Sequence, residues 1–209
     1  MAHALDLIGE RWALLIVREL LLGPKRFTDL RAGLRGASAD VLAQRLREMT
    51  DAGVVRRKKL PPPAGSEVYE LTEWGADLAP IVDHLGRWGS RSPSLDPTAD
   101  SSIDSLVLSL RALFDPQSAQ RFNATVGLRL GGEDFTVNVQ DGKLEVVRHV
   151  AVHPAATLDT DRNTLATLLY QGRPLGEALS TGDATVTGKA NVIERFLGLF
   201  SLPEPARNQ

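Results

Sequence analysis

The sequence predicts a mainly α-helical domain that contains one β-hairpin, followed by an α+β domain whose antiparallel sheet is covered by helices. Apolar residues recur every three or four positions through most of residues 4–89, which is typical of amphipathic helices. Residues 90–102 are rich in Ser, Pro and Asp and lack an apolar period, as a linker does. Beyond them, alternating apolar residues between turn residues indicate strands. We therefore expect a first domain at residues 1–91, a linker at 92–102 and a second domain at 103–209.

The first domain is expected to hold four helices and a hairpin. Gly23-Pro24 ends the first helix, and Ser38 is a suitable N-cap for the third. The predicted elements are helices over residues 4–22, 26–34 and 38–52, strands over 54–60 and 67–71 around a proline-rich turn at 61–65, and a last helix over 73–89. A short helix followed by a longer one after a tight turn is a helix-turn-helix, and the hairpin is its wing. The mainly α domain is therefore predicted to be a winged helix-turn-helix.

Composition excludes several classes of site. The chain has no cysteine, so disulfides and thiolate metal sites are impossible. Its four histidines are scattered, and we expect neither a metal site nor a cofactor. There is no nucleophile elbow and no glycine-rich phosphate loop, so an enzyme is not expected. The start of the chain does not resemble a signal peptide and the apolar runs are short, which predicts a cytoplasmic protein without membrane contact.

The net charge of −2 conceals an uneven distribution of charge along the chain. Residues 1–92 carry 14 Lys and Arg against 12 Asp and Glu, whereas residues 93–209 carry 10 against 14. Within residues 25–59 the counts are 10 basic and 4 acidic. A local basic excess in an acidic protein indicates a surface that binds a polyanion, although a solvated surface with clustered charge is the alternative.

The predicted third helix has the composition of a DNA recognition helix. We expect its inward face to carry Val41, Leu42, Leu46 and Met49, and its outer face to carry polar side chains. Glutamine can read adenine through two hydrogen bonds, and arginine can read guanine or hold a phosphate. Together with basic residues before the second helix and on the wing, the predicted DNA-binding residues are Lys25, Arg26, Ser38, Ala39, Asp40, Gln44, Arg45, Arg47, Arg56, Arg57, Lys58 and Lys59.

Each of these assignments has a structural alternative. Arg47 could instead pair with Asp51 on the helix surface, and Lys58 and Lys59 could keep an edge strand soluble. Successive wing residues point to opposite faces, so not all four basic residues there can contact one DNA backbone. The three tryptophans lie within helical apolar patterns, and we expect core or dimer-interface positions for them rather than stacking on bases: Trp12, Trp74 and Trp88.

Four segments of the first domain closely resemble the HxlR-type winged-helix regulators. They are GERW at Gly9–Trp12, GPKRFTDL at Gly23–Leu30, VLAQRLREM at Val41–Met49 and YELTEWG at Tyr69–Gly75. The resemblance implies a homodimer formed through the terminal helices, with two recognition helices in successive major grooves of a palindromic operator in double-stranded DNA. Many members sense electrophiles with a cysteine before the first helix. This chain has none, which excludes that mode of sensing.

The second domain is expected to form an α+β fold. Glycine-containing turns at 131–132 and 141–142 separate alternating runs, a strong signal of hairpins. Val150 and Val152 could extend this sheet or begin another strand. The predicted elements are helices over residues 103–114, 161–171, 175–179 and 191–200, and strands over 125–130, 135–139, 144–146 and 184–187.

The order of these elements, and the closing segment LSTGDATVTGKANVIERFLGLF, are similar to the sterol-carrier-protein type 2 fold. That resemblance implies an apolar ligand between sheet and helices. The lining would then come from Phe135, Val137, Val139, Leu165, Leu169, Phe196 and Phe200. For any one of these residues, the alternative is that it only fills the core.

The function predicted from these features is that of a dimeric transcription repressor whose DNA binding responds to an apolar small-molecule effector in the second domain. Two alternatives stay open. The chain could be a carrier of apolar ligands whose winged helix contacts protein, or a regulator whose second domain is purely structural.

Overall fold

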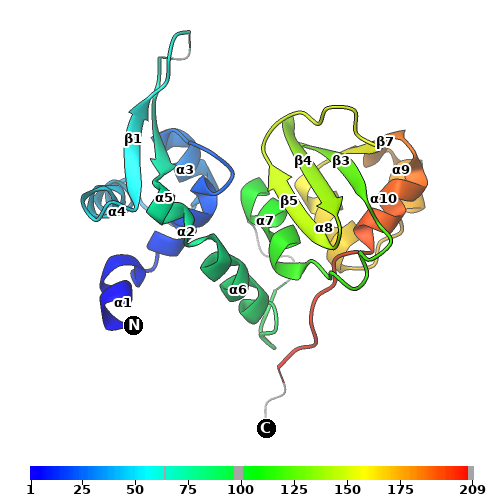
Figure 1. The fold of residues 1–209 in the computed structure, drawn as a ribbon, viewed down its shortest axis with the longest axis horizontal. Helices are drawn as coiled ribbons and strands as arrows, with labels where there is room; N and C mark the ends of the chain where they lie inside the picture. The colour runs from blue at the N-terminus through cyan, green and yellow to red at the C-terminus, as the bar shows by residue number, and fades with distance from the viewer. Residues whose placement is uncertain (64, 97–100, 207–209) are drawn as a thin grey trace. The chain divides into compact units, whose positions relative to one another are not determined.

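The computed structural model describes residues 1–63, 65–96 and 101–206 of the chain (Figure 1). The chain divides into two compact units, residues 1–84 and 85–209. The first unit contains a two-stranded sheet among short helices, and the second is built on a five-stranded sheet.

The first unit has the predicted order of short helix, longer helix, hairpin and final helices. Its elements are α1 (Ala2–Ile8), α2 (Ala13–Leu20), α3 (Phe27–Gly33), α4 (Ala39–Asp51), β1 (Val55–Lys59), β2 (Glu67–Leu71), α5 (Glu73–Ala76) and the start of α6 (Ala79–Gly89). Their shared core includes Ile16, Leu30, Leu42, Leu46 and Met49. Because these residues come from α2, α3 and α4, the core fixes the helix-turn-helix pair against the helix that precedes it.

Two predicted helices are each broken into two. The first prediction, residues 4–22, was wrong across Gly9 to Trp12. The Gly9 amide donates the last α-helical hydrogen bond of α1, to the Leu5 carbonyl at 2.8 Å, and α2 begins only at Ala13. A Cβ at Gly9 would lie 2.5 Å from that oxygen, so the turn favours glycine. The last predicted helix is interrupted at residues 77–78. Pro80 lacks the N–H that would bond the Ala76 carbonyl, which separates α5 from α6.

Local signals placed α4 and the wing correctly. The Ser38 hydroxyl accepts from the Val41 amide at 3.3 Å and caps α4, as predicted. β1 and β2 pair antiparallel from Val55 opposite Leu71 to Lys59 opposite Glu67. Of the predicted turn at 61–65, residue 64 lies outside the described residues.

The second unit holds α7 (Ile103–Leu113), β3 (Ala124–Leu130), β4 (Glu133–Gln140), β5 (Lys143–Val147), β6 (Ala156–Thr160), α8 (Arg162–Tyr170), α9 (Leu175–Thr181), β7 (Ala184–Gly188) and α10 (Ala190–Leu197). The strand order is β5-β4-β3-β6-β7. Nearly every predicted element is present within a few residues of its expected bounds. β6 was missed, because it is short and has only two apolar residues, Ala156 and Leu158.

The predicted all-antiparallel sheet is wrong at one pair of strands. β6 runs parallel to β3, with Val126 opposite Ala156 and Leu130 opposite Thr160. The segment between β5 and β6 passes from one edge of the hairpin strands to the far side of β3, so β6 enters the sheet in the direction of β3. Val150 and Val152 lie in this crossing segment and are exposed, not in a strand.

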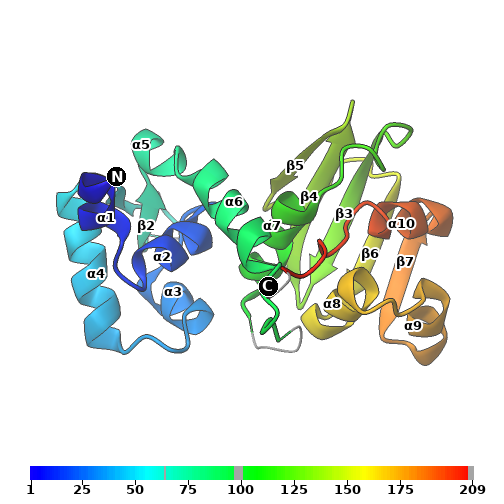
Figure 2. The same ribbon diagram turned by 90° about the horizontal axis from the view of Figure 1, so that it is seen from below.

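The two faces of the five-stranded sheet differ in polarity. Val126, Leu128, Val137 and Leu158 are fully or almost fully buried on one face, and Figure 2 shows α7, α8 and α10 on the viewer's side of the sheet. Arg129, on the other face, bridges neighbouring strands: its Nε lies 3.0 Å from Asp134 and its Nη1 3.5 Å from Asp159. An apolar face packed by helices and a polar face open to solvent agree with the predicted α+β arrangement.

The predicted linker is partly described. Residues 97–100 lie outside the described residues, and Ser102 caps α7 through the Ser105 amide. Arg91 contacts the C-terminal segment: its carbonyl accepts a hydrogen bond from the Ala206 amide at 2.7 Å. None of the helices in the described part of the chain is long and apolar enough to cross a membrane.

Candidate nucleic-acid interface

The outer face of α4 consists of the residues that do not pack into the core. Leu42, Leu46 and Met49 are buried on one stripe. Val41 is 40% exposed, so its predicted inward position is wrong. One residue before Leu42 is about 100° around the helix, which turns Val41 towards the solvent. The exposed face of α4 contains Asp40, Val41, Gln44, Arg47 and Glu48.

The first turn of α4 is polar and accessible. Ser38 is exposed, and Ala39 is partly buried. The small side chain of Ala39 leaves the backbone open to a close approach. Asp40 is exposed in the same turn. Its negative charge interacts favourably with the positive end of the helix dipole but repels a phosphate. Phosphate binding at this end of α4 therefore depends on the basic residues around it.

The middle of α4 carries a polar cluster. Gln44 donates from Nε2 to Glu48 Oε1 at 3.0 Å, and the other Glu48 oxygen pairs with Arg45 Nη1. Arg45 Nη2 lies 3.3 Å from Glu10 Oε2, in the turn before α2. The ion pairs of α4 in the described structure thus involve Arg45, whereas the alternative considered above joined Arg47 to Asp51. Arg47 is exposed.

The turn before α3 contains a buried ion pair. Glu19 is fully buried in α2, and its carboxylate lies 2.7 Å from Lys25 Nζ and 3.0 Å from Arg18 Nη2. The carboxylate also packs against Gly33, where a Cβ would lie 2.4 Å from Glu19 Oε2. A buried carboxylate requires such partners. The predicted phosphate contact Lys25 is therefore engaged within the protein, while Arg26 is exposed at the start of α3.

Sequence reasoning missed Glu19, although a signal was present. Glu19 follows Ile16 by three positions and therefore falls on the apolar face of the helix. A charged residue at such a position indicates a buried ion pair.

The wing divides its basic residues between two faces. Arg56 Nε lies 2.7 Å from Glu70 Oε1, and Lys58 Nζ lies 3.1 Å from Glu70 Oε2. On the opposite face, the guanidinium of Arg57 lies 5.3 Å from the centre of the Tyr69 ring. Lys59 continues that face opposite Glu67. The alternation of side chains along a strand therefore places two of the four cations on each face of the hairpin.

Glu70 is held as a carboxylate by the wing. Partial burial acts to raise its pKa, but the hydrogen bonds and positive charges of Lys58 and Arg56 outweigh this and lower the pKa below its ordinary value. One carboxylate therefore neutralises part of the charge of two exposed cations.

In the second unit, the seven residues named above as a ligand lining are all buried. Phe135, Val137, Val139, Leu165, Leu169, Phe196 and Phe200 are each at most 7% exposed. The rings of Phe196 and Phe200 meet edge to face with centroids 5.0 Å apart, and Phe114 lies 6.2 Å from Phe200. The end of α7, α10 and the segment after α10 thus share one aromatic cluster.

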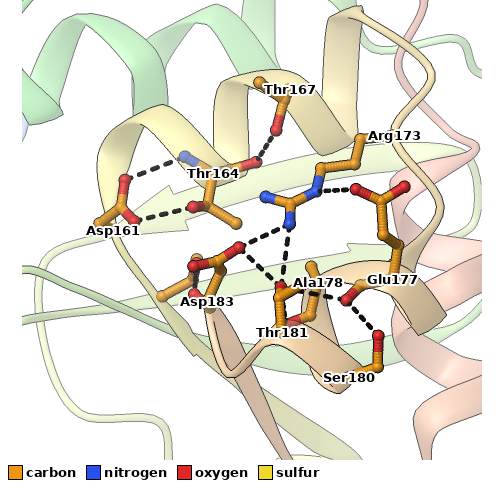
Figure 3. A network of polar contacts seen from close by, with 10 residues as sticks. Asp161, Thr164, Thr167, Arg173, Glu177, Ala178, Ser180, Thr181 and Asp183 are labelled. Carbon is orange, nitrogen blue, oxygen red and sulfur yellow. Dashed lines mark hydrogen bonds and ion pairs between the residues drawn. The ribbon is translucent and has the colours of Figure 1, made fainter.

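A network of polar side chains fixes α9 beside β7 (Figure 3). Arg173 donates from Nη2 to Asp183 at 2.5 Å and from Nε to Glu177 at 3.1 Å, while Thr181 donates to Asp183 at 2.7 Å. These hydrogen bonds from Arg173 and Thr181 lower the pKa of Asp183. Asp161 caps α8 nearby through two backbone amides, at 2.6 and 2.9 Å. The contacts of Arg173 and Thr181 link α9 to the residue that precedes β7.

Comparison with known proteins identifies both parts of the chain. Residues 7–96 match the HxlR-like helix-turn-helix family, and residues 94–208 match the alkyl sulfatase C-terminal family. The HTH-type transcriptional regulator YvaP of Bacillus subtilis is 39% identical over 87 residues, which are 42% of this chain and 81% of YvaP. YodB of the same organism is 34% identical over 91 residues, which are 44% of this chain and 81% of YodB. The solved reduced form of YodB is 33% identical and covers 45% of this chain and 92% of its own, with a TM-score of 0.41.

The prediction of a non-enzymatic regulator is confirmed by the first part, since its relatives are HTH-type transcriptional regulators. The second part matches a family other than the sterol carriers, and the sterol-carrier-like fold stays a prediction. The chain belongs to the HxlR-like helix-turn-helix family of transcriptional regulators through residues 7–96, and to the alkyl sulfatase C-terminal family through residues 94–208.

Proposed function

We propose that this chain is a homodimeric transcriptional repressor that binds duplex DNA through α4 and the wing and responds to an apolar small molecule held in its second unit. The observation that carries the DNA-binding part is the exposed polar face of α4 beside a strand with four consecutive basic residues. A helix enters the major groove, while basic residues on either side hold the phosphates.

The proposed roles follow from exposure and chemistry. Gln44 reads a base edge, and the exposed methyl groups of Val41 contact a thymine methyl. Arg26 and Arg47 are exposed and bind phosphates, as do the cations of the wing. Lys25 stays with Glu19 and contributes to the position of α3, not to DNA contact.

The proposed dimer rests on exposed apolar side chains of the terminal helices. Ile81, Leu85 and Trp88 follow one another at spacings of four and three on α6, and all three are exposed, Trp88 to 75%. Leu5 on α1 and Trp74 on α5 are exposed as well. Such residues mark an interface, and two-fold symmetry would match a palindromic operator. We therefore place Trp74 and Trp88 in the dimer interface.

The proposed effector is an apolar molecule with an alkyl chain. The family matched by residues 94–208 is named for an alkyl sulfatase, and the buried aromatic cluster of Phe196 and Phe200 offers matching chemistry. Such a molecule, held between sheet and helices in a sterol-carrier-like arrangement, would act by binding one conformation of the dimer more tightly than the other.

A purely structural second unit is the second candidate, favoured by the complete burial of Phe135, Val137, Val139 and Phe196. Native mass spectrometry of the purified chain, with and without an added medium-chain fatty acid, separates the two. A bound molecule supports the sensor. An unchanged mass at saturating fatty acid supports the structural unit.

The DNA-binding proposal is tested by fluorescence anisotropy with labelled duplexes from the region around the chain's own gene. We expect binding that weakens steeply between about 50 and about 200 mM salt, because phosphate contacts release counterions. A folded dimer that binds no duplex at low salt would overturn the proposal. Binding that did not change with salt would favour a carrier whose winged helix contacts protein.

A further inference from the structure

Four polar side chains form a continuous series of contacts from the turn before α2 to the exposed face of α4. Glu10 contacts Arg45 Nη2 at 3.3 Å, and Arg45 Nη1 pairs with Glu48. Glu48 then accepts from Gln44 at 3.0 Å. Arg45 and Glu48 each contact two partners through different atoms, so the orientation of one side chain constrains the next. We name this series the Glu10–Gln44 relay.

Arg45 is poorly placed to read a base itself. Its side chain is 17% exposed, whereas the Glu10 side chain is 65% exposed. Its Nε is buried without a hydrogen-bond partner. Reading guanine requires two guanidinium N–H groups directed into the groove, and Arg45 would have to leave both carboxylates to provide them. A partly buried guanidinium shared by two carboxylates is restrained by both of them.

Gln44, by contrast, keeps the groups that adenine requires. Its amide nitrogen has two N–H donors, and Glu48 occupies one of them. The second N–H and the amide oxygen remain for N7 and N6 of adenine. The bond to Glu48 also fixes which end of the amide is the donor, because a flipped amide would bring two oxygen atoms together. Gln44 is therefore presented to DNA in one orientation.

We propose that Arg45 and Glu10 are positioning residues for sequence recognition: they hold Glu48, and through it the amide of Gln44, in the orientation that reads adenine. The inference rests on the proposed function, in which α4 enters the major groove. It replaces direct base reading by Arg45, as predicted from the sequence, with an indirect effect on the base pair that Gln44 reads.

The loss of Arg45 has two consequences. Glu48 retains a negative charge on the DNA-facing side of α4 without its guanidinium, which weakens binding to all duplexes. The carboxylate is also free to turn away from Gln44, so the preference for adenine falls by about tenfold, the discrimination expected of one bidentate contact. Loss of Glu10 leaves the Arg45–Glu48 pair in place and has a smaller effect at the same base pair.

The experiment selects bound sequences from a duplex library randomised over two helical turns, using full-length wild type, Arg45→Ala, Gln44→Ala and the double variant. We expect both single variants to relax the preference at the same base pair by about tenfold. We expect the double variant to show no further loss there, because the two residues act through one contact. Circular dichroism confirms that each variant folds.

Matched variants separate orientation from charge. Glu48→Gln removes the charge and keeps a single oxygen, which can no longer accept from Gln44 and Arg45 through separate atoms, so it retains part of the base preference, whereas Glu48→Ala loses it. Glu10→Ala weakens the preference at the same base pair, and Asp6→Ala, which removes one exposed carboxylate from α1, leaves it unchanged. Glu10→Ala and the Glu48 pair also carry the test if Arg45→Ala fails to fold.

Two results would overturn the inference while leaving DNA binding intact. Arg45→Ala could relax a guanine at another base pair, additively with Gln44→Ala, which would make Arg45 a base-reading residue. Glu10→Ala and Glu48→Ala could both leave every preference unchanged, which would make the relay irrelevant to recognition. A folded wild type that selects no sequence and binds no duplex would instead overturn the proposed function.

Discussion

The ammonium of Lys25 lies 2.7 Å from the carboxylate of Glu19, which is fully buried in α2. Lys25→Met leaves that carboxylate with fewer partners, and we expect it to lower the free energy of unfolding by about 3 kcal/mol, as for other broken buried ion pairs. Urea denaturation measures the loss. Arg31→Met, at an exposed position of α3, serves as the control and changes stability little.

The same pair decides whether Lys25 contacts DNA. If Lys25 is structural, folded Lys25→Met keeps the salt dependence of wild type, whereas Arg26→Ala loses one phosphate contact and flattens the log–log slope by about 1. Anisotropy titrations over a salt series measure both slopes. If the salt slope flattened equally in the two variants, Lys25 would again count as a DNA-binding residue.

The wing gives a third prediction, based on the two faces of one hairpin. Glu70→Gln releases Arg56 and Lys58 from their shared carboxylate, while Glu67→Gln removes the same charge from an exposed position on the other face. We expect Glu70→Gln to strengthen binding to all duplexes and to steepen the salt slope by about 1, because one further cation becomes available to phosphate. Glu67→Gln should have a smaller effect. Identical slopes for the two variants would show that Glu70 does not restrain the cations.

The extent to which the sequence predicts this molecule depends on how local each signal is. The Ser38 cap and the strand Val55–Lys59 depend on neighbouring residues, and both were predicted correctly. The parallel pairing of β6 with β3 depends on a crossing segment whose path no local pattern determines. A single apolar period also ran through Gly9 and Pro80, where backbone chemistry breaks the helices.

The candidate DNA-binding site shows the same difference between local and tertiary features. Residue types and strand alternation indicated which side chains could meet DNA, but not which of them are already occupied within the protein. Arg45 meets Glu10, 35 positions earlier in the chain, and Lys25 meets a carboxylate on another helix. Such tertiary ion pairs engage a predicted DNA-contact residue within the protein, and only the three-dimensional arrangement reveals them.

The network around Arg173 predicts a pH dependence. Hydrogen bonds from Arg173 and Thr181 lower the pKa of Asp183 in the folded state, so folding favours its charged form. The stabilisation is present above the ordinary pKa of the unfolded carboxyl, about 4, and is lost as the pH falls through the lowered value. Asp183→Asn should therefore be less stable than wild type at pH 7, with a difference that shrinks on acidification. Thermal denaturation at several pH values measures it. Asp141→Asn, in the turn between β4 and β5, is the control, and a difference that grew in acid would contradict the assignment.

The exposed face of α6 gives the last prediction. Ile81, Leu85 and Trp88 lie on one face of this helix, and no core of the described chain covers them. If they meet a second copy of the chain, Ile81→Asp places a charge in an apolar interface and should convert the dimer to a monomer that binds DNA at least tenfold more weakly, since only one half-site is then held at a time. Sedimentation velocity measures the oligomeric state and anisotropy the affinity. Asp83→Ala, on another face of the same helix, should stay dimeric. An Ile81→Asp chain that stayed a dimer with unchanged affinity would exclude this face of α6 from the interface.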